Sequence, residues 1–278
     1  MRKQALCLVL AVIGFSGLAV SGAAYADTPC NCTPAVPPAD VDDWALRALA
    51  GYTKTSGTSD TTAFNGAFHV AHTVDQWKFL FGAQALYSST DNVASAQDLG
   101  AEFQANYNIS DRLYWFGGLS YDNNKFSGFQ YQEMIDTGVG YQFFKDADTK
   151  LSGQVGIGEM RQEPELVTAN PFYPPGPLMF RTPLSSTSNV AATAAVNFEH
   201  SFNDSTKLLA NGSIVSSSAN TLTTLGVGLQ VKMSHRLSLV AAYQLISNSK
   251  VPDGISKSSG LTTLNLAYEL KNPNLAPQ

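Results

Sequence analysis

Histidines placed beside a serine, an aspartate or an asparagine would be the residues able to support hydrolysis. The chain has four histidines, at positions 69, 72, 200 and 235. His69 and His72 are three residues apart, so an extended strand would point them to opposite faces. His200 and His235 lie near the ends of the segments that contain them. No histidine is matched with a nucleophile, and we expect the chain not to be an enzyme and to need no cofactor or metal.

Charged residues recur at every second position of several segments, among small and polar residues. Acids outnumber bases in this set, and two interpretations stay open. The charges either pair across a shared interior and plug it, or line a water-filled passage with a weak preference for cations. The predicted interior-lining residues are Arg47, His69, Lys78, Asp98, Glu102, Asp136, Glu199, Lys232 and Glu269.

The elements that must position these residues are strands with period-two alternation. The clearest is the segment WKFLFGAQALY, from Trp77 to Tyr87, in which every second residue is apolar. A tilted strand of about 9–11 residues crosses a bilayer. A Trp and a Tyr at its two ends suit the two membrane interfaces. The segment therefore predicts a membrane-spanning strand.

About twelve segments repeat this scheme, and an even number is typical of single-chain bacterial barrels. We predict an all-β fold, a transmembrane antiparallel up-and-down β-barrel, with an apolar outer face and a polar inner face. The aromatic residues expected in the two membrane girdles are Trp44, Tyr52, Trp77, Tyr87, Tyr107, Trp115 and Tyr268.

The predicted connections alternate between short and long, as short periplasmic turns and longer extracellular loops do. This parity places both ends of the barrel in the periplasm. The longest connection runs from about Gln162 to Ser188, with an extracellular loop over residues 162–187 that is rich in proline. Its residues Phe172, Tyr173 and Phe180 are candidates for contact with a partner, and a lid across the mouth is an equal alternative.

The composition argues against a secreted soluble sandwich. Only 14% of the 278 residues are charged, against about 25% in ordinary proteins, too few to coat a water-facing exterior. The formal net charge of −5 argues against nucleic acid as a partner.

The first 26 residues predict a signal peptide, with Arg2 and Lys3, an apolar stretch, and an Ala-Tyr-Ala cleavage site ending at Ala26. Residues 27–42 form a proline-rich periplasmic tether, 43–270 the barrel, and 271–278 a C-terminal tail. The tether carries Cys30 and Cys32. This pair either closes on itself, links two chains, or is incidental.

Glu133 departs from the alternation. In phase with Tyr131 and Ile135 it would face lipid, at a cost of a few kcal/mol if it lay mid-membrane. We expect either a position near the outer rim or a bulge that turns it inward.

The run from 237 to 270, LSLVAAYQLISNSKVPDGISKSSGLTTLNLAYEL, resembles the closing hairpin of the YdiY-like family of salt-induced outer-membrane proteins, a domain of unknown function. The shared pattern is a strand, an N-S-x-x-P-x-G loop from Asn248, and then T-x-x-L-x-Y-E. Trp44, Arg112-x-Tyr114, Tyr121 and Gly138-x-Gly140-Tyr141 are similar to that family's spacing. The resemblance covers about 43–270 and implies an outer-membrane barrel with no catalytic residues to transfer. The proline-rich insertion departs from the pattern.

These observations favour a porin-like barrel in the outer membrane of a Gram-negative envelope. Its expected role is envelope integrity or passive passage of small solutes, and the resemblance implies a link to salt or osmotic stress. The alternative is a closed barrel that acts as an interaction scaffold through its outer loop; an outer-membrane hydrolase fits less well. The expected partners are the lipid bilayer and lipopolysaccharide, with the barrel-assembly machinery and periplasmic chaperones during biogenesis.

Overall fold

A computed structural model describes residues 44–55, 61–90, 93–124, 129–169, 179–251 and 257–272. The predicted signal peptide and tether, with Cys30 and Cys32, lie outside these residues, as do Phe172, Tyr173 and most of the predicted tail. The side chain of Phe180 is likewise not described. No helix in the described ranges is long and apolar enough to cross a membrane.

The described chain is built from strands. They are β1 (Trp44–Thr55), β2 (Thr61–Val74), β3 (Trp77–Thr90), β4 (Val93–Asn108), β5 (Leu113–Asn124), β6 (Phe129–Lys145), β7 (Thr149–Ala169), β8 (Met179–Pro183), β9 (Thr187–Asn203), β10 (Thr206–Ser217), β11 (Thr221–Lys232), β12 (Leu237–Asn248) and β13 (Ser258–Asn272).

Twelve of these strands form a closed antiparallel barrel. Consecutive strands pair from β1 to β7, then β7 pairs with β9, and the order continues to β13, which pairs back onto β1. The additional strand, β8, pairs only with the far end of β7. The predicted fold class, with its even number of strands, is therefore confirmed.

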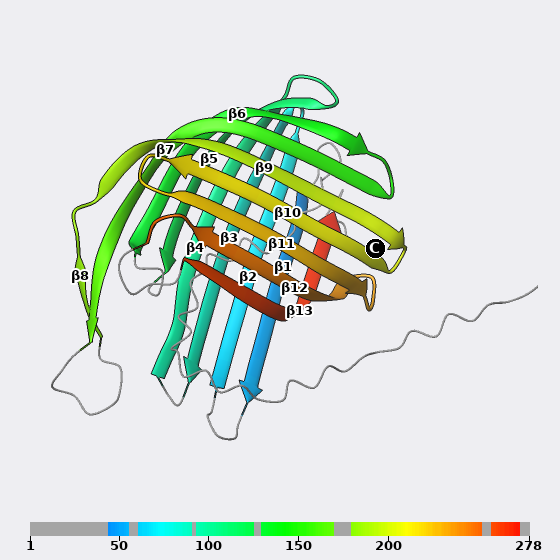
Figure 1. The fold of residues 1–278 in the computed structure, drawn as a ribbon. Helices are drawn as coiled ribbons and strands as arrows, with labels where there is room; N and C mark the ends of the chain where they lie inside the picture. The colour runs from blue at the N-terminus through cyan, green and yellow to red at the C-terminus, as the bar shows by residue number, and fades with distance from the viewer. Residues whose placement is uncertain are drawn as a thin grey trace, which may run out of the picture.

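Strands on opposite sides of the barrel cross, because strands tilt relative to the axis of a closed barrel. In Figure 1 the blue and cyan strands β1–β4 run at a large angle behind the yellow and orange strands β9–β12, and β6 and β7 curve over the far side to join them. On the inner face of one wall, Leu49 of β1 packs with its register partner Ala267 of β13 and with Val240 and Ala242 of the next strand, β12, in a dry cluster. Alternation alone did not predict this apolar packing inside the barrel.

Glycines permit the sharp curvature of β6 and β7. A Cβ atom on Gly138 would overlap the backbone of Val155, and one on Gly158 would overlap the backbone of Ile135. Gly156 is approached by the backbone carbonyl of Thr137 in the same way. Backbone atoms cannot rotate aside as a side chain does, so this corner requires residues without a Cβ.

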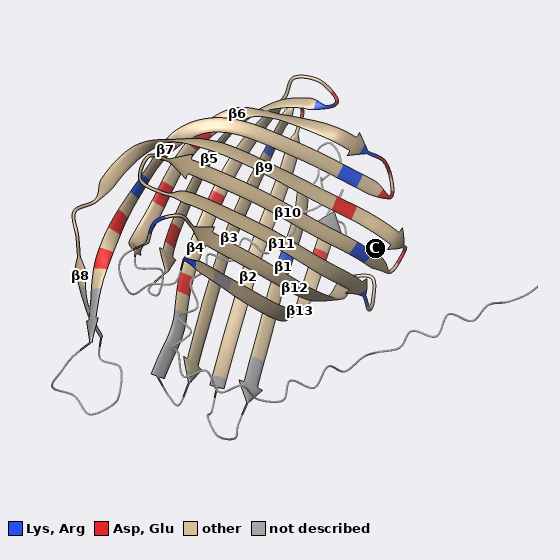
Figure 2. Cartoon of the chain, viewed as in Figure 1, with Lys and Arg blue, Asp and Glu red and all other residues tan. Residues whose placement is uncertain are grey.

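The exterior is apolar. Large hydrophobic side chains stand exposed on most strands, among them Ile157 at 60% and Leu264 at 61%. Aromatic residues lie toward both ends of the strands, and the Trp77 and Tyr107 rings lie 5.1 Å apart. Figure 2 shows charged residues gathered toward strand ends and connections. An apolar band between aromatic ends is the surface of an outer-membrane barrel, which places the protein in the outer membrane.

The predicted girdle residues are all at least partly exposed. Trp44, Tyr52, Trp77, Tyr87, Trp115 and Tyr268 have exposed side chains, and Tyr107 is half-buried.

The predicted long connection begins and ends as expected, since the last β7–β9 pair is Gln162 with Thr187, but it is not a loop throughout. Strand β7 continues to Ala169, β8 occupies Met179–Pro183, and β9 begins at Thr187. The segment beyond the barrel wall is thus a β-hairpin, which runs outward from the wall in Figure 1. Proline suggested a loop, but this hairpin needs hydrogen bonds from one side only, and edge positions tolerate proline.

Glu133 lies near the loop end of β6, where it pairs with Tyr121 on one side and Arg161 on the other. The pairing of β6 with β7 shifts register between Phe129 and Tyr131. The guanidinium of Arg161 lies 6.0 Å from the centre of the Tyr131 ring. Glu133 is therefore beside a cation at the end of the strand.

Candidate functional site

The barrel interior holds two adjoining cavities, which form the candidate site. The loop-end cavity, of about 180 Å³, is nearer the long connections. The turn-end cavity, of about 380 Å³, is nearer the short turns. Both are lined by residues that project inward from alternate positions of the strands.

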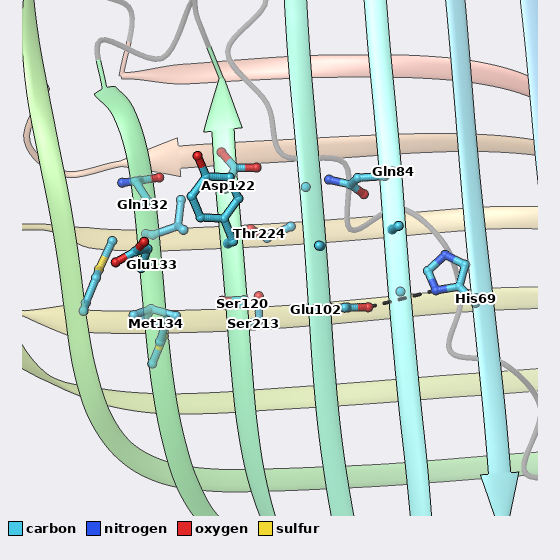
Figure 3. A pocket seen from close by; sticks show the side chains of 18 residues that line it. His69, Gln84, Glu102, Ser120, Asp122, Gln132, Glu133, Met134, Ser213 and Thr224 are labelled. Atoms are coloured by element: carbon cyan, nitrogen blue, oxygen red, sulfur yellow. Dashed lines mark ion pairs between the residues drawn. The ribbon is translucent and has the colours of Figure 1, made fainter.

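Polar side chains from opposite walls line the loop-end cavity (Figure 3). His69 on β2 faces Glu102 on β4, with 4.0 Å between Nδ1 and Oε1. Glu102 reaches this position over Gly82 on the intervening strand β3, where a side chain would collide with it. Asp122, Gln132 and Thr224 add further polar groups to the lining, together with Gln84, Ser120, Glu133 and Ser213.

The two cavities meet at a waist. The residues that line both are His69, Glu102, Ser120, Met134, Ser213 and Val215. This set combines one ionisable pair, two hydroxyls and two apolar side chains. The waist therefore joins the two polar spaces through a short section of mixed character.

Carboxamides cross the interior in the turn-end cavity. Gln104 on β4 donates from Nε2 to Oδ1 of Asn106 at 2.7 Å, and to Oε1 of Gln154 on β7 at 3.4 Å. Tyr114 on β5 donates to the same Gln154 oxygen at 3.4 Å. The Tyr114 ring occupies the space that a side chain at Gly140 would need. Uncharged hydrogen-bonding groups thus dominate the middle of this cavity.

Lysines gather at the turn end of the same cavity. Lys150 on β7 and Lys207 on β10 both contact Glu199 on β9, at 3.8 Å and 2.9 Å between Nζ and Oε1. Lys150 lines the cavity together with Lys78 on β3 and Lys145 on β6, whereas Lys207 is not among the lining residues. Cations therefore exceed acids at this end.

A second ionic cluster lies where β1 and β13 close the barrel. Arg47 is 2% exposed. Its Nε lies 3.6 Å from Oε1 of Glu269, and its Nη2 donates to Gln230 at 3.1 Å. Gln230 in turn donates to Glu269 at 2.9 Å and to Ser238 at 3.1 Å. This network ties β1, β11, β12 and β13 together.

The loop end of the interior is closely packed with polar groups. Asp98, Asn124 and Glu165 are buried. Asn220 donates to Asn248 at 2.6 Å, joining two neighbouring connections.

The structure brings some of the predicted lining residues together and separates others. Arg47 contacts Glu269, and His69 lies against Glu102. Asp98 is buried at the loop end, while Lys232 is exposed at the turn end.

Asp136, Glu199 and Lys78 each line the turn-end cavity. Asp136 accepts a hydrogen bond from Thr193 at 3.2 Å, on a strand two positions away.

Lys150, Lys207 and Gln154 were not predicted as interior residues from the sequence. The signal was available, because Lys150, Ser152 and Gln154 share the inward parity of Gly156 and Gly158 on β7. What alternation could not show is that Gln154 meets Gln104 from the opposite wall. No group of three or more histidine, cysteine, aspartate or glutamate residues in the described ranges is placed to hold a metal ion.

A family model described as "Protein of unknown function, DUF481" matches residues 48–270. No curated protein matches the chain in sequence.

Solved structures similar to this chain include three outer-envelope barrels. The translocator domain of autotransporter NalP from Neisseria meningitidis has 10% identity, covers 81% of this chain and 87% of that one, and gives a TM-score of 0.45. The COG4313 outer membrane channel from Pseudomonas putida F1 has 11% identity, 88% and 99% coverage, and a TM-score of 0.44. The NanC porin has 12% identity, 81% and 97% coverage, and a TM-score of 0.42.

Proposed function

The chain belongs to the DUF481 family, described only as proteins of unknown function, and we propose that this member is a narrow outer-membrane conduit for small polar solutes. The role is non-catalytic. The barrel supplies a wall against lipid and a polar interior, and the solute moves down its own concentration gradient.

One observation carries this proposal: the two polar cavities adjoin at the waist instead of being separated by a packed core. They have six lining residues in common, and together they extend from Asp122 near the loop end to Lys150 near the turn end. A barrel that served only as an anchor would gain stability by filling this space with apolar side chains.

The volumes limit what can pass. The turn-end cavity, about 380 Å³, lies at the small end of ligand pockets, which span about 300–1,000 Å³. The waist carries Met134 and Val215 beside its polar groups. We therefore expect passage of ions and small solutes and exclusion of oligomeric ones.

Single-channel recording in a planar bilayer tests the proposal. We expect small, steady currents from the purified barrel. Ser213→Trp should reduce them several-fold, because Ser213 projects into the waist. Leu225→Trp is the control, since Leu225 on the neighbouring strand β11 is 50% exposed on the outside and lines neither cavity. Absence of current from the folded wild-type barrel, or equal currents from the two variants, would refute the conduit.

A second role is favoured by the hairpin of β7 and β8. It extends beyond the last β7–β9 pair at Gln162 and Thr187 and exposes Leu166. A barrel that recruits a partner through this hairpin would be electrically silent. Conductance therefore separates the two roles.

The expected partners of the barrel are the membrane around it and the proteins that insert it. Its apolar band would contact the bilayer and lipopolysaccharide, and its insertion would depend on the barrel-assembly machinery and periplasmic chaperones. A contribution to envelope integrity under salt or osmotic stress rests on the resemblance to the YdiY-like family.

A further inference from the structure

We propose that the turn-end cavity binds the carboxylate or phosphate group of a small solute, with Lys78 as the anchoring charge. This inference deepens the proposed function, on which it rests, by naming the solute class. It reverses, for this half of the interior, the weak cation preference expected from counting charges along the sequence.

Lys78 is the central observation. It follows Trp77 at the start of β3, directly after the tight turn at Asp75 and Gln76, and it projects into the turn-end cavity. The side chain is half-buried, and no hydrogen bond or ion pair engages it among the described residues. Two further cations, Lys145 on β6 and Lys150 on β7, line the same cavity.

Keeping the ammonium group of Lys78 charged in this half-buried position costs free energy. Ionisable residues within a membrane-spanning structure normally pair with an opposite charge or mark an ion pathway. Here the neighbouring cations add repulsion to the cost of desolvation. A bound oxyanion would relieve both, and rings of lysine or arginine line pores that select anions and phosphate.

The local acid does not neutralise the lysines. Glu199 lies within ion-pair distance of both Lys150 and Lys207. Two other carboxylates line the cavity away from its turn end: Asp136 accepts a hydrogen bond from Thr193, and Glu102 lies beside His69 at the waist. Lys78 and Lys145 therefore remain in excess at the turn end.

The carboxamide side chains near Lys78 indicate which other chemical groups a bound solute would carry. Asn106 pairs with Lys78 across β3 and β4, and it is linked through Gln104 to Gln154 on the opposite wall. These groups offer both donors and acceptors to hydroxyl or amide groups. The cavity thus fits a compact polar molecule with one anionic group, held with that group toward the lysines.

Isothermal titration calorimetry on the purified barrel in detergent tests this without requiring conduction. The probes are inorganic phosphate and succinate, titrated at constant ionic strength in chloride, with glycerol as the neutral control. We expect the wild type to bind at least one anion and not glycerol, and the comparison of the two anions identifies the preferred group. Lys78→Gln should weaken binding about tenfold or more, as expected for loss of a charged hydrogen-bond partner. Lys78→Arg should retain binding.

Lys257→Gln is the matched control, because Lys257 is exposed and does not line the cavity; its affinity should equal that of the wild type. If Lys78→Gln does not fold, as judged by circular dichroism, Lys150→Gln provides the second test. Equal affinity in the cavity variant and the control, or no anion binding by the wild type, would overturn the inference. A silent barrel that still binds anions would refute the conduit alone, and a conducting barrel without anion binding would refute this inference alone.

Discussion

At the scale of single residues, burial distinguishes interior charges that hold the barrel together from those available to a solute. Arg47 is almost fully buried and is shared between Glu269 and Gln230. Lys78 has no such partner among the described residues. Loss of a partner costs more free energy for a buried charge than for an exposed one. Arg47 therefore has a structural role, and Lys78 is the residue that can bind the anionic group of a solute.

The structural role of Arg47 predicts strong coupling to Glu269. Arg47→Met should lower the free energy of unfolding by about 3 kcal/mol, because it leaves a largely buried carboxylate unpaired. The double variant Arg47→Met with Glu269→Leu should recover most of that loss. Urea unfolding in lipid vesicles measures both. Additive losses in the double variant would show that the two side chains do not act as a pair.

At the scale of elements, closure of the barrel depends on β6, β7 and β9 and not on the hairpin beyond them. The β7–β9 pairing extends from Thr149–His200 to Gln162–Thr187. The hairpin adds only the pairing of β7 with β8 outside that ladder. The barrel wall is therefore complete without it.

Replacement of residues 167–181 with a short Gly-Ser turn tests this separation. We expect the unfolding free energy to change by less than about 1 kcal/mol, since the removed segment adds no strand to the barrel. Conductance should also persist if the hairpin is not a lid. Loss of the folded barrel would make the hairpin part of the closure, and a large rise in current would identify it as a lid.

At the scale of the whole molecule, the exterior must match the bilayer. Ile157 lies midway along the part of β7 that pairs with β9 and is 60% exposed. Leu166 lies on the same strand beyond that part and is 48% exposed. The two positions are similar in exposure and differ in their expected depth.

Ile157→Lys should therefore destabilise the barrel in vesicles by about 2–4 kcal/mol, the cost of a lysine at the midplane, whereas Leu166→Lys should cost less than about 1 kcal/mol. Urea unfolding of the two variants gives the comparison. Equal costs would contradict the placement of the apolar band within the membrane.

The sequence by itself determined the fold class, because period-two alternation reports directly which face of a strand meets lipid. Twelve alternating strands with Trp and Tyr near their ends have few other ways to satisfy their backbone hydrogen bonds in a bilayer. The same alternation predicted that Arg47, Glu102 and Lys78 point into the barrel interior. Parity is a local property, so it needs no knowledge of distant partners.

Only the tertiary structure decided which inward residues meet. The glycines at the β6–β7 corner let the backbones of these two strands approach closely, Leu49 packs with Val240 across the intervening strand β13, and polar cavities remain elsewhere in the interior. Contacts such as Gln104 with Gln154 depend on how two distant strands cross. Such a crossing follows from the closure and curvature of the complete sheet, a collective property that alternation within one segment does not encode.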